Sequence, residues 1–335
     1  MNLRAIFLAV AIPTLLVAFA VWQSVAHLRG DTAAAATPAL SVQTKTAHPV
    51  AKAKPMTMAP RRSRAKPYGT TALPYTLDHG VKVFHLVARP AKWRVDTHTV
   101  VHAWTYNGQV PGPLLRFRQG DRVRVVVTNK LSEPTAVHWH GLDVPNAMDG
   151  VPGVTMKAIK PGKSFTYSFT VVNAPGLYIY HPHYDTLKQE GLGMYGALIV
   201  DPKTGTPRGV HEMIQVLSSF GGSYLINGKS FPSTDAYSLP AGSTGLIRMI
   251  NMDTAMNHPM HLHGVSFTEV GANGGAIPRR LQRKMDEQDV APGEAFDMRF
   301  DATHKGVWLL HCHNLTHVTG PNGADAGMIT VLKVT

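Results

Sequence analysis

The single cysteine of this sequence lies among histidines. The segment LLHCHNLTH, residues 309–317, places Cys312 between His311 and His313, and His317 follows. Imidazole nitrogens and thiolate sulfur are the ligands that bind copper, zinc and iron in proteins. A chain with one cysteine cannot form an internal disulfide, so we expect this thiol to be buried, reactive or metal-bound.

The same H-x-H spacing occurs four times along the chain. Successive side chains of a β-strand point to opposite faces, so both imidazoles of a triplet lie on one face, about 6–7 Å apart. Eight imidazoles are too many for one metal ion, and two to three ions would use them well. The four pairs are His138 and His140, His181 and His183, His261 and His263, and His311 and His313.

The strand alternation also separates Cys312 from its two histidine neighbours. If His311 and His313 share one face, the thiol points to the other. There it can join His258 and His317 in a trigonal His₂Cys site, the arrangement of blue copper, with a weak axial methionine for which Met328 is the candidate. A lone buried cysteine is usually part of the core. Four duplicated triplets together with these residues favour the metal interpretation.

The histidine motifs reveal an internal repeat. HWHG and HPHYD in the first half correspond to HLHG and HCHN in the second, and GLGMYGALIVDP and DAGMITVLKV close the two halves. Short runs such as VRVVVTN and FTYSFTV alternate with period two and are separated by turn signals. The sequence therefore predicts an all-β fold of sandwiches or barrels, with domains at residues 68–203 and 204–335.

The N-terminal region differs in composition from the rest. Residues 1–26 begin with an early arginine and a long apolar run, which predicts an export signal or a membrane anchor. Residues 27–67, rich in alanine, proline and lysine, are expected to form a disordered linker. Most of the net charge of +12 falls in these two regions. The remainder is only mildly basic, which makes nucleic acid an unfavourable partner.

These motifs resemble the four copper-binding motifs of the multicopper oxidase family. The likeness extends from about residue 78 to the end and includes NGQVPGPLLRFRQGD, MDGVPGV, IKPGKSFTY and GVWLLHCH. The resemblance implies two cupredoxin-like Greek-key domains and four copper ions per chain. It assigns type 1 copper to His258, Cys312, His317 and Met328, type 2 copper to His138 and His261, and the type 3 pair to His140, His181, His183, His263, His311 and His313.

The chain has room for two domains and so resembles the small, two-domain laccase type. Pro182 stands where a first-domain type 1 site would need cysteine. The resemblance implies a homotrimer with a trinuclear copper site between subunits, and reduction of O₂ to water with electrons that pass through Cys312. Asp149 matches the acidic position that the family uses for protons. The position after the last type 1 histidine is Val318, where an acid is usual, and residues 318–327 form a lid or a tolerated insertion.

The reducing substrate is the least determined feature. Phenols are favoured by the resemblance to small laccases. The methionines Met249, Met252, Met256 and Met260 suggest Cu(I) oxidation as the alternative, since thioethers favour Cu(I), although methionine is also ordinary core filler. Copper nitrite reductase, a copper or electron carrier, and a zinc hydrolase are rival interpretations. The protein is expected to be exported, to the periplasm or the cell exterior.

Overall fold

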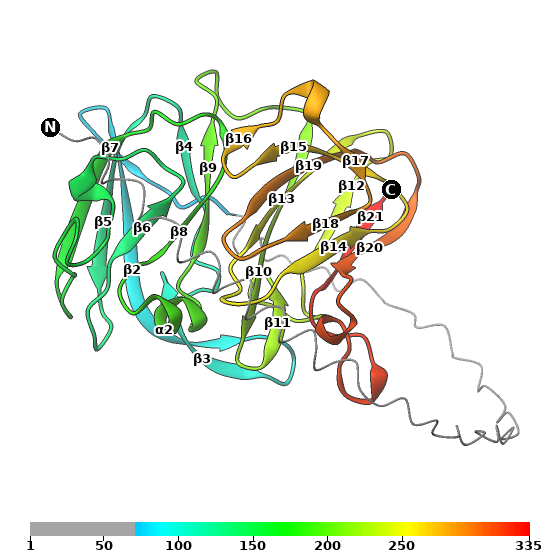
Figure 1. The fold of residues 1–335 in the computed structure, drawn as a ribbon, viewed down its shortest axis with the longest axis horizontal. Coiled ribbons are helices and arrows are strands. Elements are labelled where there is room, and N and C mark those ends of the chain that lie inside the picture. Colours follow the sequence, from blue (N-terminus) through cyan, green and yellow to red (C-terminus); the bar gives the residue numbers. More distant parts are fainter. Residues whose placement is uncertain (1–70) are drawn as a thin grey trace, which may run out of the picture. The chain divides into compact units, whose positions relative to one another are not determined.

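The computed structural model describes residues 71–335 (Figure 1). The predicted export signal or anchor and the linker up to residue 67 lie outside the described residues. None of the helices in the described part is both long and apolar enough to cross a membrane.

The first half of the described chain is a sandwich of two sheets. One sheet has the order β1-β2-β5-β7, with β3 paired to β2, and the other has the order β4-β9-β8-β6. The bounds of the first sheet are β1 Thr76–Asp78, β2 Val81–Arg94, β3 Val100–Tyr106, β5 Arg122–Asn129 and β7 Ser164–Thr170. Those of the second are β4 Leu115–Arg118, β6 Val137–His140, β8 Gly176–Pro182 and β9 Gly196–Asp201.

The second half is another two-sheet sandwich. Its sheets have the orders β11-β10-β13-β19-β15-β16, with β17 paired to β15, and β12-β21-β20-β14-β18. The first contains β10 Val210–Phe220, β11 Ser223–Ile226, β13 Thr244–Asn251, β15 Phe267–Ala272, β16 Gly275–Ala276, β17 Lys284–Met285 and β19 Ala295–Asp301. The second contains β12 Ala236–Leu239, β14 His258–Leu262, β18 Glu287–Val290, β20 Gly306–Cys312 and β21 Ile329–Val334.

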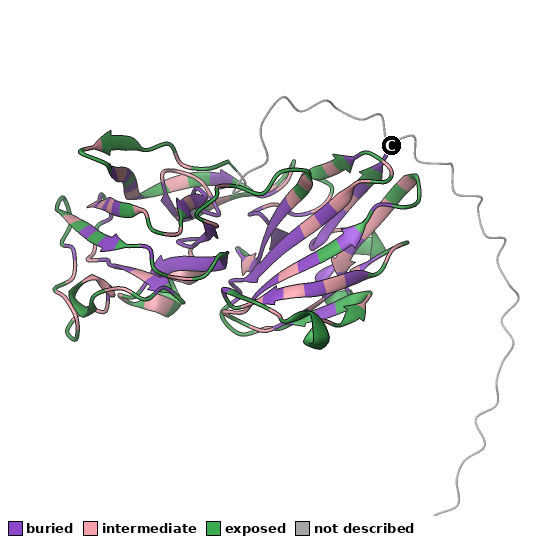
Figure 2. Cartoon of the chain, turned by 90° about the horizontal axis from the view of Figure 1, so that it is seen from above, coloured by how far each residue is buried: buried purple, intermediate pink, exposed green. Residues whose placement is uncertain are grey.

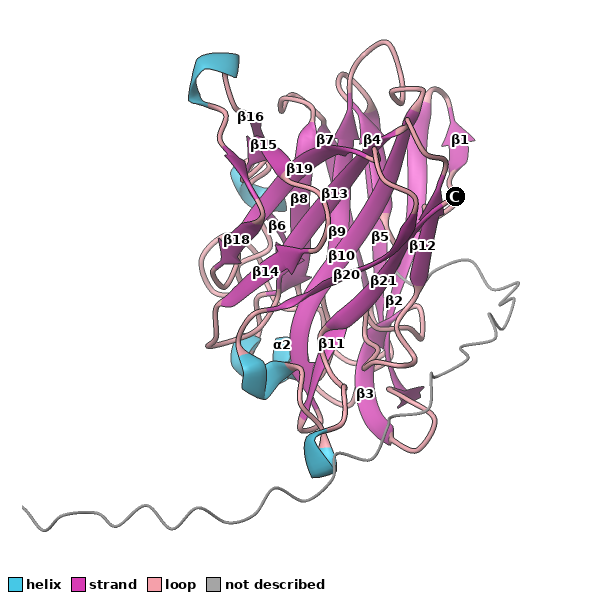
Figure 3. Ribbon diagram, turned by 90° about the vertical axis from the view of Figure 1, so that its right-hand side faces the viewer, coloured by secondary structure: helices cyan, strands magenta, loops and turns pink. Residues whose placement is uncertain are grey.

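Helical structure is sparse in the described part of the chain (Figure 3). The predicted all-β class is therefore confirmed. The helix α2 covers Thr186–Gly191, and four 3₁₀ turns cover η1 Asn146–Met148, η2 Arg279–Leu281, η3 Leu315–His317 and η4 Pro321–Gly323.

The two sandwiches share a third hydrophobic core between them. In β8, Tyr178 and Tyr180 point into the core of the first sandwich, while Leu177 and Ile179 join the shared core. The second sandwich contributes residues of β10, β11, β13 and β19 to that shared core. Strands that are buried on both faces have continuous apolar runs, which explains why β8 and β9 are buried along their whole length. Figure 2 colours the buried residues purple, and they lie on strands in both halves of the chain.

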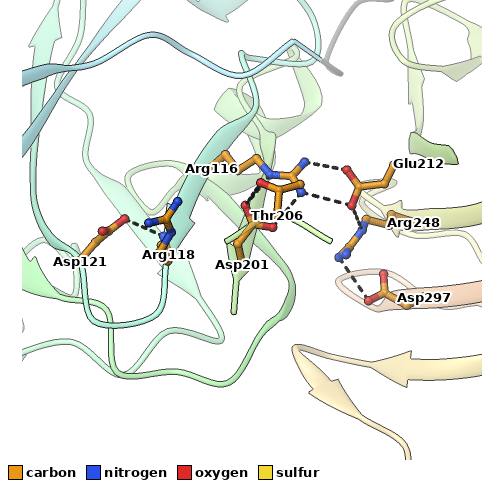
Figure 4. Close-up of polar contacts among 8 residues, drawn as sticks. All are labelled: Arg116, Arg118, Asp121, Asp201, Thr206, Glu212, Arg248 and Asp297. Carbon is orange, nitrogen blue, oxygen red and sulfur yellow. Dashed lines mark hydrogen bonds and ion pairs between the residues drawn. The ribbon is translucent and has the colours of Figure 1, made fainter. Parts of the chain in front are cut away.

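A chain of ion pairs crosses the same boundary (Figure 4). Arg116 of β4 donates to both carboxylate oxygens of Asp201, each at 2.8 Å, and to Glu212 of β10 at 2.7 Å. Arg248 of β13 continues the chain to Glu212 at 3.0 Å and to Asp297 at 3.3 Å. These residues lie largely out of solvent, so each charge depends on its partners.

Candidate metal centre

Cys312, His258 and His317 form a buried cluster in the second sandwich. The Nδ1 atoms of His258 and His317 lie 3.1 Å apart, and the Cys312 Sγ lies 3.9 Å and 3.5 Å from them. All three side chains are almost inaccessible to solvent. Two imidazole nitrogens and one thiol converging on a point match the His₂Cys donor set of a blue copper site.

The ionisation of this cluster also fits a metal site. Burial raises the pKa of the Cys312 thiol to about 11, and burial together with the neighbouring His258 lowers the pKa of His317. At neutral pH the protein alone therefore leaves an uncharged Cys312 thiol beside an uncharged His317 imidazole. A bound cation would stabilise the thiolate, because metal coordination deprotonates a thiol.

Met328 lies beside this cluster because its backbone is tied to two of the ligands. The Cys312 N–H donates to the Met328 carbonyl oxygen at 3.0 Å, and the Met328 N–H donates to that of His317 at 3.0 Å. Gly327 has a φ of 71°, and a Cβ there would lie 2.0 Å from the His317 oxygen. Glycine is thus required for this close approach, which places the buried Met328 in the same core cluster as Cys312.

Four histidines of the first sandwich form one set, which we name the first imidazole set. His138 of β6 is directly opposite His181 of β8 in the strand register. The ring centroids of His138 lie 6.1 Å from His140, 5.4 Å from His181 and 5.5 Å from His183. The alternation turns Trp139 and Tyr180 into the core and the imidazoles to the other face, as the sequence predicts.

The second imidazole set repeats this arrangement in the second sandwich. His261 of β14 is opposite His311 of β20, as His138 is opposite His181. The ring centroid of His261 lies 4.9 Å from that of His263 and 5.8 Å from that of His313. The Nε2 atoms of His263 and His311 lie 2.9 Å apart. Two uncharged nitrogens facing one another at that distance suit a shared cation.

Backbone carbonyls orient several of these rings. His138 Nδ1–H donates to the Asp149 oxygen at 2.8 Å, and His261 Nδ1–H donates to that of Asp286 at 3.0 Å. His181 and His311 make the equivalent contact with the carbonyl of the following residue, at 3.0 Å and 2.9 Å. A ligating histidine usually donates its second ring N–H in this way. Each of these four rings therefore presents Nε2 to a metal.

The two imidazole sets remain apart within one chain. In residues 71–335, the ring contacts occur inside each set and none joins one set to the other. The second set lies on the outer face of the β14–β20 sheet, whereas the first sandwich packs against the other sheet, through β10, β13 and β19. The eight imidazoles of the four pairs therefore do not converge on one site within a single chain.

The predicted acid Asp149 lies at the first imidazole set. Besides its carbonyl contact, its carboxylate Oδ1 is 3.4 Å from His138 Nδ1. Gly150, with a φ of 87°, allows this segment to approach β6, since a Cβ there would lie 1.8 Å from the Val137 oxygen. The MDG segment thus holds an acid against a candidate ligand.

Sequence reasoning missed two further acids beside candidate ligands. Glu190 of α2 lies 3.4 Å from His181 Nδ1, and burial raises its pKa to about 7. Asp253 is 2% exposed, with Oδ2 3.4 Å from His258 Nε2. Burial opposes ionisation of Asp253, but the nearby polar groups of His258 and Ser219 and a hydrogen bond from the Ala255 amide lower its pKa to about 2. No sequence motif marks Glu190. Asp253 lies shortly before the HPMHLHG segment, and that position could have indicated an acid close to His258.

The methionines near the His258 motif are mainly core residues. Met249 and Met260 are fully buried in the second sandwich, and Met252 belongs to the shared core. Met256 alone among the four is partly accessible. Packing therefore explains three of the four residues that suggested Cu(I) chemistry.

Comparison with known proteins identifies the family. Residues 88–205 and 206–335 each match a multicopper oxidase family domain. The fold resembles the crystal structure of blue copper oxidase from Nitrosomonas europaea, with a TM-score of 0.71 and 31% identity, covering 75% of this chain and 85% of that one. This likeness supports the cupredoxin-like architecture expected from the sequence.

Two curated relatives extend the comparison. Laccase-1 of Cryptococcus neoformans is 37% identical over 274 residues, which cover 68% of this chain and 42% of that protein. Copper resistance protein A of Escherichia coli is 44% identical over 105 residues, which cover 31% of this chain and 17% of that protein. The chain thus spans less than half the length of either. On these matches and the geometry of its sites, the chain belongs to the multicopper oxidase family of copper oxidoreductases and contains two domains of that family.

Proposed function

We propose that this protein couples one-electron oxidation of a small reducing substrate, a phenol in the first instance, to the reduction of O₂ to two waters. One observation carries the proposal. The sulfur of Cys312 belongs to the buried His₂Cys cluster, while its two chain neighbours belong to the second imidazole set. Two different ligand sets are thereby joined through the peptide of three consecutive residues.

Copper bound at these residues, four ions per chain, would supply the one-electron storage and the O₂ chemistry. The chain itself supplies burial and direction. The His₂Cys cluster excludes water, and its covalent connection to His311 and His313 makes Cys312 the residue that carries electrons between the sites. The second set, on an outer face, is accessible to O₂.

Protons for O₂ reduction would come from acids beside the first imidazole set. Asp149 lies against His138, and Glu190 lies against His181. Val318 is buried in the core of the second sandwich, so the position after His317 contributes no acid here. Two first-domain acids would thus serve as the proton route.

A homotrimer would complete the O₂ site. One chain presents the second imidazole set on the outer face of β14 and β20, with no partner set of its own in residues 71–335. A neighbouring copy would bring its first imidazole set to that face, giving eight imidazoles for three copper ions. Each copy both offers and needs a set, so a head-to-tail contact related by a threefold rotation would satisfy all three copies in a closed ring.

A cuprous-ion oxidase is the second candidate. The similarity to copper resistance protein A supports it, and the partly accessible Met256 offers a thioether that suits Cu(I). Under either function we propose export to the periplasm or cell exterior, with attachment through residues 1–26 if that segment is retained.

The decisive experiment is a visible spectrum and copper count of the copper-loaded protein, followed by O₂ uptake with a phenol and with Cu(I). An intense visible band, about four coppers per chain, and O₂ uptake are expected, and the faster substrate identifies the subtype. One copper and no O₂ uptake would refute the oxidase and leave an electron carrier. A colourless zinc protein would indicate a hydrolase, and reduction of nitrite in place of O₂ would indicate a nitrite reductase. Native mass spectrometry tests the trimer, which a fully active monomer would exclude.

A further inference from the structure

The imidazole of His317 is closed to solvent by a tyrosine. His317 is 2% exposed, and Tyr224 of β11 stacks on its ring with centroids 3.9 Å apart and an interplanar angle of 26°. Tyr224 itself is only partly buried. The tyrosine therefore separates one face of the imidazole from solvent, and its own side chain is partly exposed to solvent.

Both ring nitrogens of His317 also have neighbours within the protein. Its Nδ1 faces Cys312, and its Nε2 lies 3.1 Å from the side-chain amide of Asn314. The Asn314 Oδ1 accepts hydrogen bonds from the Thr316 N–H at 3.3 Å and from the Thr316 hydroxyl at 2.8 Å, which fixes the amide. A substrate could hydrogen-bond the imidazole only by displacing Asn314.

The segment after His317 adds a third constraint. Residues 318–327 fold back on themselves, with the Ala326 N–H donating to the Val318 oxygen at 3.1 Å and the Gly320 N–H to that of Ala324 at 2.7 Å. The chain then returns to place Met328 beside His317. The backbone around the imidazole is hydrogen-bonded on both sides, so the stacked geometry does not depend on a loose loop.

We propose that Tyr224 is the electron-entry residue of this oxidase, and that a small donor docks on the Tyr224 side chain and not on His317. The inference deepens the proposed function and rests on it. The Tyr224 hydroxyl lies 3.9 Å from the sulfur of the partly accessible Met256, so an aromatic ring and a thioether border the docking position. This position selects the substrate, because only donors small enough to lie against the Tyr224 ring can dock there.

The electron balance is simple. A phenol donor loses one electron through the stacked Tyr224 and His317 rings toward Cys312, releases its proton to water and leaves as a phenoxyl radical. No bond to the protein forms. O₂ is the final oxidant, and four donors are consumed for each O₂ reduced to two waters.

The test compares Tyr224→Leu, Tyr224→Phe and the control Tyr75→Leu, a partly exposed tyrosine of the first sandwich. Each copper-loaded protein is mixed anaerobically with a small phenol or with ferrocyanide, and bleaching of the visible band is followed. Tyr224→Leu should slow both reactions about tenfold, in the range of changes next to metal ligands. Tyr224→Phe should restore most of the rate because the stacked ring remains. Tyr75→Leu should match the wild type.

A Tyr224→Leu protein that bleaches as fast as the wild type, or faster, overturns the proposal, since a mere shield would speed entry when removed. A wild-type protein without a visible band would instead refute the oxidase itself, so the two failures are distinguishable. Tyr224 as an electron-entry residue also requires an unchanged band position in all variants.

A second measurement uses the copper-free full chain. Diethyl pyrocarbonate labelling with peptide mass analysis should leave His317 unmodified in the wild type and modify it in Tyr224→Ala. The exposed His85 should react equally in both proteins. Equal labelling of His317 in the two proteins would show that Tyr224 does not cover it, and would overturn the docking proposal.

Discussion

The two sandwiches carry the same outer-face histidines but differ at the positions that face inward. Pro182 lies between His181 and His183 in the first, where Cys312 lies between His311 and His313 in the second. Both central residues are buried and paired with a buried residue of the neighbouring strand, Val137 and Met260 respectively. Only the second sandwich places a metal-binding atom at this position.

The difference extends to the other buried ligand. The residue three positions before His138 is Thr135, and three before His261 is His258. Thr135 is fully buried and donates its hydroxyl hydrogen to Gln189 at 2.7 Å. A buried hydrogen bond therefore occupies the position at which the second sandwich has the candidate ligand His258. Because a strand alternates its side chains, the outer and inner faces of one repeat can be altered independently. The first sandwich thus has the outer histidine set and lacks the His₂Cys cluster of the second.

Replacing Cys312 by serine should give the largest effect. The variant makes the second sandwich resemble the first, since a hydroxyl cannot replace the thiolate. We expect loss of the visible band and a fall of about a thousandfold or more in substrate-driven O₂ uptake, comparable to removal of other essential catalytic groups. Spectroscopy, copper analysis and O₂ uptake measure this. Retention of about three coppers per chain is expected, and a persisting visible band would contradict the assignment.

His138→Ala should impair O₂ reduction and leave the visible band of the His₂Cys cluster intact. It removes one outer ligand of the first set and leaves the His₂Cys cluster intact. O₂ uptake should fall about a hundredfold, as for loss of ligand interactions at metal sites, while the visible band and its anaerobic bleaching remain. The matched variant His85→Ala, at an exposed histidine of the same sandwich, should change neither. Simultaneous loss of the band would mean that the two sites are not independent.

Asp201→Asn tests the ion-pair chain that reaches the boundary between the two sandwiches through Arg116. It removes the carboxylate that Arg116 contacts twice and should lower the free energy of unfolding by about 2–3 kcal/mol at pH 7, because a largely buried charge loses a partner. Burial alone would raise the pKa of Asp201, but Arg116 and Thr206 lower it. The carboxylate therefore stabilises the fold above its unfolded pKa of about 3.9. That stabilisation is lost as the pH falls through the lower folded value.

Denaturant unfolding of wild type and Asp201→Asn from pH 7 to pH 3 measures this effect. The difference between the proteins should shrink below about pH 4. A difference that grows in acid would reverse the sign of the argument.

Glu190→Gln should give the smallest of these effects. Burial raises the pKa of Glu190 to about 7, so near neutral pH this carboxyl is partly protonated beside His181. The amide cannot exchange a proton, and we expect O₂ turnover to fall about tenfold. The pH profile of turnover should lose an inflection near 7. If the variant keeps this inflection, another group supplies the proton, and Asp149 is then the next candidate.

Much of the metal centre could be predicted because strand geometry is local. The alternation alone places His311 and His313 on one face and Cys312 on the other, and the repeat shows that His138 and His261 are equivalent. What could not be predicted are residues without a motif, such as Tyr224 and Glu190, whose significance comes from what packs against them.

The sequence by itself determined the all-β class, the duplication and which histidines share a strand face, since each follows from residue types at a period of two. Tertiary structure alone decided that Tyr224 covers His317, that Arg116 joins the two sandwiches, and that the two imidazole sets lie apart in one chain. The physical reason is the same for all three. They depend on which sheet faces pack together, and that is set by contacts between residues far apart in the sequence.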